Sequence, residues 1–144
     1  MKIAIVAQGA MGAGVGALLR RGGAQVVTSL NGRSAASAKR AQDAGMSPVS
    51  DAELASADML LSILPPGDAL AFANRMAPHL AAATRKPLFA DCNAVSPATV
   101  RRIAEVIAAT GAEFVDAGII GGPPRASRPN SVSMAKRAAA RPEA

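Results

Sequence analysis

The stretch VAQGAMGAGVGALL, residues 6–19, decides the fold. It overlaps the short apolar run KIAIVA at residues 2–7, whose Ile and Val content is typical of a buried β-strand. Apolar side chains then recur at helical spacing along one face (Met11, Val15, Leu18 and Leu19), which predicts a helix over residues 10–21. A strand, a glycine-rich turn and a helix in this order can bind a phosphate group, because the first turn of the helix has free backbone N–H groups that donate to it.

Two registers of the dinucleotide-binding fingerprint G-x-G-x-x-G compete in this turn. One places Ala7, Gly9 and Gly12 at the three fixed positions and begins where the strand ends. The other places Gly12, Gly14 and Ala17 there and begins five residues later. We prefer the first, because Met11 already lies on the apolar face and the helix has therefore begun. A glycine-rich turn without a ligand remains the alternative, since the motif is weak when taken alone.

The rest of the chain alternates between strand and helix. Helices are expected over residues 34–44, from about 50, and over 65–80 and 96–111. Further strands are expected over residues 24–30, within 44–50, and over 57–64, 86–93 and 112–120. Strict alternation predicts an α/β fold, a doubly wound parallel sheet of six strands with helices on both faces.

The pattern stops after Gly121, and we divide the chain into a nucleotide-binding domain, residues 1–122, and a tail, residues 123–144. The tail is rich in Pro, Arg and Ala and is expected to be poorly ordered. It carries five basic residues and one acidic residue from Arg125 onward, whereas residues 1–124 have a net charge of only +2. The basic end could contact nucleic acid, but the chain lacks Tyr and Trp for base stacking, so a solvated end is preferred.

Length and composition limit the classes of protein to which the chain can belong. The 144 residues suit one domain, half of them are apolar, and no run is long enough to span a membrane. The single cysteine, Cys92, excludes an internal disulfide and is compatible with a reducing compartment, so we expect a cytoplasmic protein. No cluster of residues with metal-ligand spacing is present in the sequence.

The end of the second expected strand selects the cofactor. An acid there would bind the ribose 2′-hydroxyl of NAD, but the segment VVTSLNGRSAAS, residues 26–37, has none. Arg33 can instead pair with a 2′-phosphate, and Ser34, at a helix start, can add a hydrogen bond. We therefore predict NADP rather than NAD, with a solvated turn arginine as the alternative for Arg33.

Five segments together resemble the β-hydroxyacid dehydrogenase and 6-phosphogluconate dehydrogenase superfamily. They are GAMG (9–12), NGRS (31–34), LLSILPPGDAL (60–70), ADCNAVSPATVRRI (90–103) and FVDAGIIGG (114–122). The resemblance implies a Rossmann domain whose pyrophosphate loop is Gly9, Ala10, Met11 and Gly12. It also implies that Asn31, Arg33 and Ser34 hold the 2′-phosphate, that Leu64 and Pro65 lie along the cofactor, and that Asn93 lies near the nicotinamide.

The sequence departs from the family pattern at several positions. Ala7 replaces the usual first glycine, Asn93-Ala94 replaces Ser-Thr, and Ile120 replaces a serine that helps to bind hydroxy acids, so hydroxy-acid specificity is not carried over. The family's helical domain with its catalytic lysine has no counterpart here. Lys136 lacks the glycine spacing of that lysine, so no catalytic residue is assigned. We expect the tail to be a truncated or frameshifted end, which the other reading frames of the DNA would test.

Other candidates have simpler interpretations. We expect His79 to be an exposed helix-end residue, Cys92 a small buried residue, and Asp91 and Asp116 structural carboxylates at strand ends. Three hypotheses remain for function. In the first, the chain is the NADP-binding domain of an oxidoreductase that moves hydride to or from a small alcohol, acid or imine. In the second, it is an inactive NADP(H)-binding module. In the third, it is a fragment prone to self-association through an exposed face. The expected partners are NADP(H) and, only with a second domain, a small-molecule substrate, with no nucleic acid or membrane.

Overall fold

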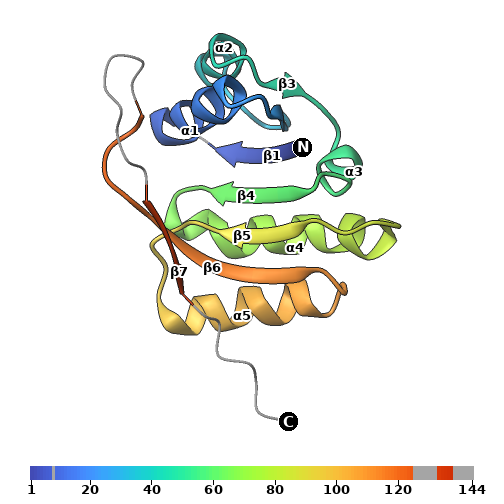
Figure 1. The fold of residues 1–144 in the computed structure, drawn as a ribbon. Coiled ribbons are helices and arrows are strands. Elements are labelled where there is room, and N and C mark those ends of the chain that lie inside the picture. The colour runs from blue at the N-terminus through green and yellow to red at the C-terminus, as the bar shows by residue number, and fades with distance from the viewer. Residues whose placement is uncertain (8, 125–132, 138–144) are drawn as a thin grey trace.

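The computed structural model describes residues 1–7, 9–124 and 133–137. In these residues the strands form a single sheet in the order β3-β2-β1-β4-β5-β6-β7, shown in Figure 1. The first six strands pair in parallel and β7 runs antiparallel to β6. The strands are β1 Lys2–Ala7, β2 Gln25–Thr28, β3 Ser47–Pro48, β4 Met59–Ile63, β5 Leu88–Asp91, β6 Glu113–Ile120 and β7 Ser133–Arg137.

Helices connect the parallel strands. They are α1 Ala10–Arg21, α2 Ala35–Asp43, α3 Asp51–Leu54, α4 Ala69–Ala82 and α5 Pro97–Ala108, with a short 3-10 turn, η1 Pro66–Asp68, before α4. Local sequence explains where three of them begin. Ser34, Ser50 and Ser96 each accept the backbone N–H of the residue three positions on, which satisfies a donor that the first turn leaves free.

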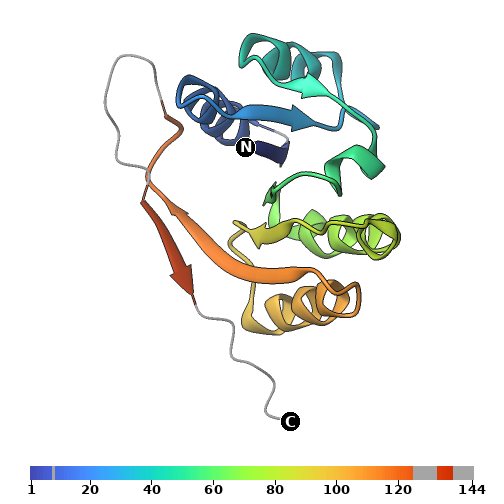
Figure 2. The same cartoon turned by 45° about the vertical axis from the view of Figure 1, so that its right-hand side comes forward.

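Two apolar layers cover the sheet, one on each face. Side chains of α3, α4 and α5 pack with Phe89 and the alternate residues of the central strands, and all the members of this layer are buried. Side chains of α1 and α2 pack with Ile5, Leu61 and Ala90 on the opposite face. Figure 2 shows α4 and α5 beside each other along the lower half of the sheet, with α1 and α2 at the other end. The doubly wound arrangement predicted from the alternation is confirmed.

The structure adds one strand to the prediction. Ser133–Arg137 pair with β6 in the register Ala117↔Lys136, so the sheet continues beyond the six parallel strands. The sequence analysis missed β7 because a short antiparallel edge strand depends on its distant partner. The rest of the tail that was expected to be poorly ordered, residues 125–132 and 138–144, lies outside the described residues.

Candidate nucleotide-binding site

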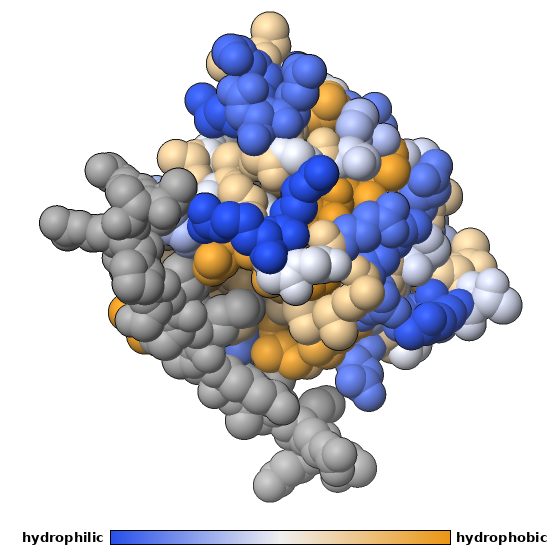
Figure 3. Space-filling model, turned by 45° about the horizontal axis from the view of Figure 1, so that its top comes forward, coloured by the Kyte–Doolittle hydropathy of each residue, from blue (hydrophilic) through white to orange (hydrophobic). Residues whose placement is uncertain are grey.

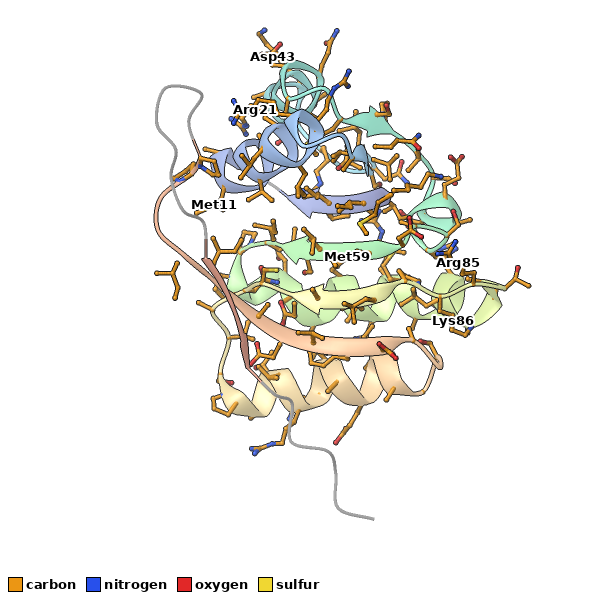
Figure 4. All side chains as sticks on the ribbon, in the orientation of Figure 1. Met11, Arg21, Asp43, Met59, Arg85 and Lys86 are labelled. Atoms are coloured by element: carbon orange, nitrogen blue, oxygen red, sulfur yellow. The ribbon has the colours of Figure 1, made fainter. Side chains whose placement is uncertain are left out.

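The candidate site lies where β1 and its two neighbours, β2 and β4, end. The chain leaves β1 in one direction to β2 and β3 and in the other to β4, so the connections separate at this point of the sheet. Open α/β sheets bind ligands in the crevice at such a point, outside the carboxyl ends of the strands. In Figure 4, Met11 marks this edge, and Arg85 and Lys86 lie at the opposite one.

Gly9 is the N-cap residue of α1, and the helix begins at Ala10 as the first register predicts. Its φ of −145° is open to any residue type. A Cβ atom built there would meet no protein atom within 4 Å. The described part of the protein therefore does not itself require glycine at this position, whereas the close approach of a ligand to the backbone would.

The first turn of α1 offers N–H groups without competition from a side chain. No side chain caps this helix in the described part of the chain, and its first turn contains no acidic residue. The N–H of Ala13 donates to the carbonyl of Gly9 at 3.3 Å. Gly12 is buried, and Met11 is half-buried beside the apolar layer of α1. The turn expected to wrap a pyrophosphate thus has the geometry that a negatively charged group requires.

A pocket opens between this turn and α2. It encloses roughly 300 Å³, part of it open solvent, and is lined by Gly9, Ala13, Thr28, Leu30, Arg33, Ser37, Arg40, Ala41 and Met46. It brings Gly9 and Arg33 together, two of the predicted site residues. Sequence reasoning missed Ser37 and Arg40, although their spacing of three positions on the helix expected after Ser34 was a usable signal. Figure 3 shows hydrophilic residues gathered over α2 at the top of the molecule.

Asn31, Arg33 and Ser34 belong to the turn that joins β2 to α2. The backbone N–H of Arg33 donates to the carbonyl of Leu30 at 3.0 Å, and Gly32 adopts a φ of +71°, which favours glycine. Ser34 uses its hydroxyl to cap α2 and lies 3.2 Å from the Ser37 hydroxyl, while the Arg40 guanidinium donates to that same hydroxyl at 3.4 Å. Asn31 is exposed and does not line the pocket.

Burial and two charged residues, Arg75 of α4 and Asp68 of η1, act on the guanidinium of Arg33. Burial is the main cause that lowers the pKa of Arg33, and the positive charge of Arg75 lowers it further. The carboxylate of Asp68 acts in the opposite direction. This side of the pocket therefore contains a half-buried guanidinium, that of Arg33, whose pKa depends on residues far away in the sequence.

The predicted nicotinamide end is assembled around Asn93, which is 8% exposed. The side-chain oxygen of Asn93 accepts the backbone N–H of Leu64 at 2.6 Å, and its NH₂ donates to the Ser62 hydroxyl at 3.0 Å. Asn93 thus ties the segment after β5 to the end of β4, and its amide group is engaged within the protein. Pro65 follows Leu64 and is exposed. The structure thus brings Leu64 and Asn93 together, and their predicted roles towards a cofactor stay predictions.

Two further groups lie at this edge. Asp91 is 1% exposed; burial raises its pKa to about 6, and Asp116, its register partner on β6, contributes in the same direction. Oδ1 of Asp91 accepts the N–H of Asn93 at 3.1 Å, while Oδ2 has no hydrogen-bond partner among the described residues. Burial, assisted by both aspartates, raises the pKa of the Cys92 thiol to about 12. Cys92 is therefore a buried thiol and not a nucleophile, in agreement with the sequence interpretation.

His79 lies in the last turn of α4, at a helix end as predicted. Its side chain is 39% exposed, so it is partly covered, and its Nε2 lies 4.0 Å from Oδ2 of Asp51. The residues that the structure describes contain no group of three or more His, Cys, Asp and Glu side chains able to hold a metal ion. No helix in this described portion is long and apolar enough to cross a membrane.

Solved structures share this architecture. The conserved protein MTH1747, of unknown function and described as similar to 3-hydroxyacid dehydrogenases, is 32% identical with a TM-score of 0.76, over 85% of this chain and 45% of its own. A conserved hypothetical protein from Sinorhizobium meliloti is 27% identical with a TM-score of 0.73, over 85% and 42%. The 3-hydroxyisobutyrate dehydrogenase of Mycobacterium tuberculosis, solved with L-serine, is 26% identical with a TM-score of 0.66, over 84% and 41%.

The chain therefore spans less than half the length of these solved relatives. No curated protein matches it. A match to a sequence family covers more of the chain than the matches to these three solved structures do, because it runs from the first strand into the tail. Over residues 2–141 the sequence matches the NAD binding domain of 6-phosphogluconate dehydrogenase, and the chain belongs to that family of pyridine-nucleotide-binding domains.

Proposed function

We propose that this domain binds NADP(H) in preference to NAD(H) and supplies the cofactor site of an oxidoreductase that moves hydride to or from a small alcohol, acid or imine. The observation that carries the proposal is the pair of arginines, Arg33 and Arg40, lining the pocket beside the end of β2. Among the described residues, no acidic side chain lines that pocket to accept a hydrogen bond from a free ribose 2′-hydroxyl. Guanidinium groups pair well with a phosphate at that position.

Each part of the site has a role under this proposal. Residues 9–12 receive the pyrophosphate through backbone N–H groups at the start of α1. Arg33 and Ser34, with Asn31, hold the 2′-phosphate, and Arg40 and Ser37 extend this set along α2. Leu64, Pro65 and Asn93 form the nicotinamide end. When bound, the cofactor supplies the hydride chemistry, and the residues of this chain bind and orient it.

A titration with NADPH and with NADH, followed by nicotinamide fluorescence, tests the cofactor preference. One charge-assisted hydrogen bond contributes about 1.5–3 kcal/mol, which corresponds to a preference of roughly ten- to hundredfold for NADPH. Arg33→Gln and Arg40→Gln should each reduce that preference while leaving the affinity for NADH nearly unchanged. Arg102→Gln is the matched control, because Arg102 is exposed on α5 away from the pocket. Equal affinities of the unaltered protein for the two cofactors would refute the proposed preference.

Binding without turnover is the second candidate function. It is favoured by the titratable groups at the nicotinamide end, since Cys92 holds its proton and Asp91 is only 1% exposed. Neither group is therefore available for proton transfer to a substrate at neutral pH. Assaying NADPH consumption and NADP reduction with panels of small alcohols, acids and imines distinguishes the two functions. Saturable binding with no turnover would support the binding module.

A further inference from the structure

A partly buried polar cluster contacts the turn that carries Arg33. Its centre is Ser29, which follows β2 and is 2% exposed. The Ser29 hydroxyl accepts the backbone N–H of Asn31 at 3.3 Å and a guanidinium N–H of Arg75 at 2.9 Å. Arg75 comes from α4, so the cluster connects the turn to a helix 46 residues further along the chain.

Asp51, the first residue of α3, fixes the orientation of Arg75. Two guanidinium nitrogens of Arg75 donate to the two carboxylate oxygens of Asp51, at 2.8 and 2.6 Å. This forked contact leaves little rotational freedom to the arginine. The pKa of Asp51 is lowered, first by its hydrogen bond with Arg75 and also by one with Ser29, while the pKa of Arg75 is raised by Asp51. The three side chains therefore act as one unit.

The unit also acts on Arg33, which lines the pocket. The positive charge of Arg75 lowers the pKa of Arg33, and the negative charge of Asp68, just before α4, raises it. Asp51 forms an ion pair with Arg75, which offsets part of the positive charge of Arg75. Arg75 therefore acts on the turn mainly through its hydrogen bond to the Ser29 hydroxyl. Asp68 is exposed and acts by charge, since it competes with any phosphate for Arg33.

We infer that Arg75, held by Asp51 and acting through Ser29, is the positioning residue that sets the turn of Asn31, Arg33 and Ser34 for recognition of a 2′-phosphate. The inference rests on the proposed preference for NADP(H) and names a determinant of that preference outside the turn itself. The guanidinium fork stabilises one position of the Ser29 hydroxyl, and Ser29 in turn holds the N–H of Asn31. A lysine presents all its N–H donors from one nitrogen atom and cannot reproduce the planar fork, in which Nε and Nη2 donate to the two oxygens of Asp51 while Nη2 also donates to Ser29.

The test compares two probes that differ only in the 2′-phosphate, adenosine 2′,5′-bisphosphate and 5′-AMP, by calorimetric titration. The measured quantity is the ratio of their affinities, because general damage to the fold lowers both alike. Ser29→Ala changes no charge and should lower the ratio roughly three- to tenfold, the effect of losing about one hydrogen bond. Arg75→Met should lower it at least as much, and Arg75→Lys should not restore it.

Two further variants complete the design. Arg85→Met is the matched control, since Arg85 makes a similar 2.6 Å ion pair with Asp58 at the opposite edge of the sheet and should leave the ratio unchanged. Asp68→Asn should raise the ratio severalfold by removing the competing carboxylate. Thermal denaturation verifies that every variant is folded at the temperature of the titration.

The outcomes distinguish this inference from the proposed function. If the unaltered protein binds both probes equally, the preference for a 2′-phosphate is itself refuted. If it prefers the bisphosphate but Ser29→Ala and Arg75→Met keep the ratio, only the positioning role is overturned. Full restoration by Arg75→Lys would show that charge, and not the fork, is what matters.

Discussion

Asp91 ends β5 with a carboxyl group that is 1% exposed, and replacing it with asparagine should stabilise the protein at neutral pH. Burial is the main cause that raises its pKa from 3.8 to about 6, with a further contribution from Asp116. The folded protein therefore keeps a proton on Asp91 at pH values where the unfolded chain has released it. The stabilising effect of that proton is complete below pH 3.8 and is lost as the pH rises through 6.

The size of the effect follows from the two pKa values. Each pKa unit corresponds to about 1.4 kcal/mol, so the ionised carboxylate costs the folded state about 3 kcal/mol above pH 7. Asn at position 91 retains a side-chain oxygen for the N–H of Asn93, which Oδ1 of Asp91 accepts at 3.1 Å. It carries no charge, so the cost of burying a charge and the repulsion from Asp116 both disappear. The cost of burying the NH₂ group in place of Oδ2 does not change with pH, so the pH dependence of the difference isolates the charge.

The assay is urea unfolding of the wild-type protein and Asp91→Asn at steps between pH 4 and pH 8. The difference between their free energies of unfolding should shift in favour of the variant by about 2–3 kcal/mol across this range. Asp51 and Asp58 have lowered pKa values and oppose this trend, because their stabilising effect is lost in acid. They are the same in both proteins and cancel in the difference. A difference that is equal at pH 4 and pH 8 would refute the reasoning.

Three other predictions test the site and the scaffold. Gly9→Val should weaken NADPH binding at least tenfold with little change in melting temperature, because the new side chain enters space where no described protein atom lies within 4 Å of its Cβ; equal losses of binding and stability would contradict this. Lys86→Met should lower the free energy of unfolding, measured by urea unfolding, by about 1.5–3 kcal/mol. The Lys86 ammonium donates to the carbonyls of Leu80 and Ala81, in the last turn of α4, and to that of Ala83, the residue after the helix. Cys92 should react with a thiol reagent at pH 8 only in denaturant, because burial raises its pKa to about 12; rapid labelling of the folded protein would show that the strand end opens.

The parts of the fold that the sequence could predict are those determined locally. The start of α1 at Ala10 was predictable because the apolar spacing already includes Met11. Ser34, Ser50 and Ser96 stand where the expected helices begin, and each caps its helix. β7 is different. The segment SMAKR has no continuous apolar run, and its strand exists through pairing with Asp116–Ile120 of β6.

The same distinction applies to the candidate site. Gly9 and Arg33 were predicted from a turn motif and a strand end, and the structure places both on one pocket. Ser37 and Arg40 could have been found from their place on the helix that follows Ser34, because residues three positions apart on a helix share a face. The roles of the predicted residues towards a cofactor remain predictions, which the titrations above test.

Ser29, Asp51 and Arg75 carried no local signal. Ser29 is an ordinary polar residue after a strand, Asp51 stands in a capping sequence, and Arg75 sits in a helix with no motif around it. Only the packing of α3 and α4 against the end of β2 unites them, across separations of 24 and 46 residues. Because Arg75 acts on the turn from outside it, the turn sequence NGRS alone underdetermines the preference for a 2′-phosphate. Two chains with that turn but different residues at the α4 position should therefore differ in selectivity, and transferring the arginine together with the aspartate and serine should transfer the difference.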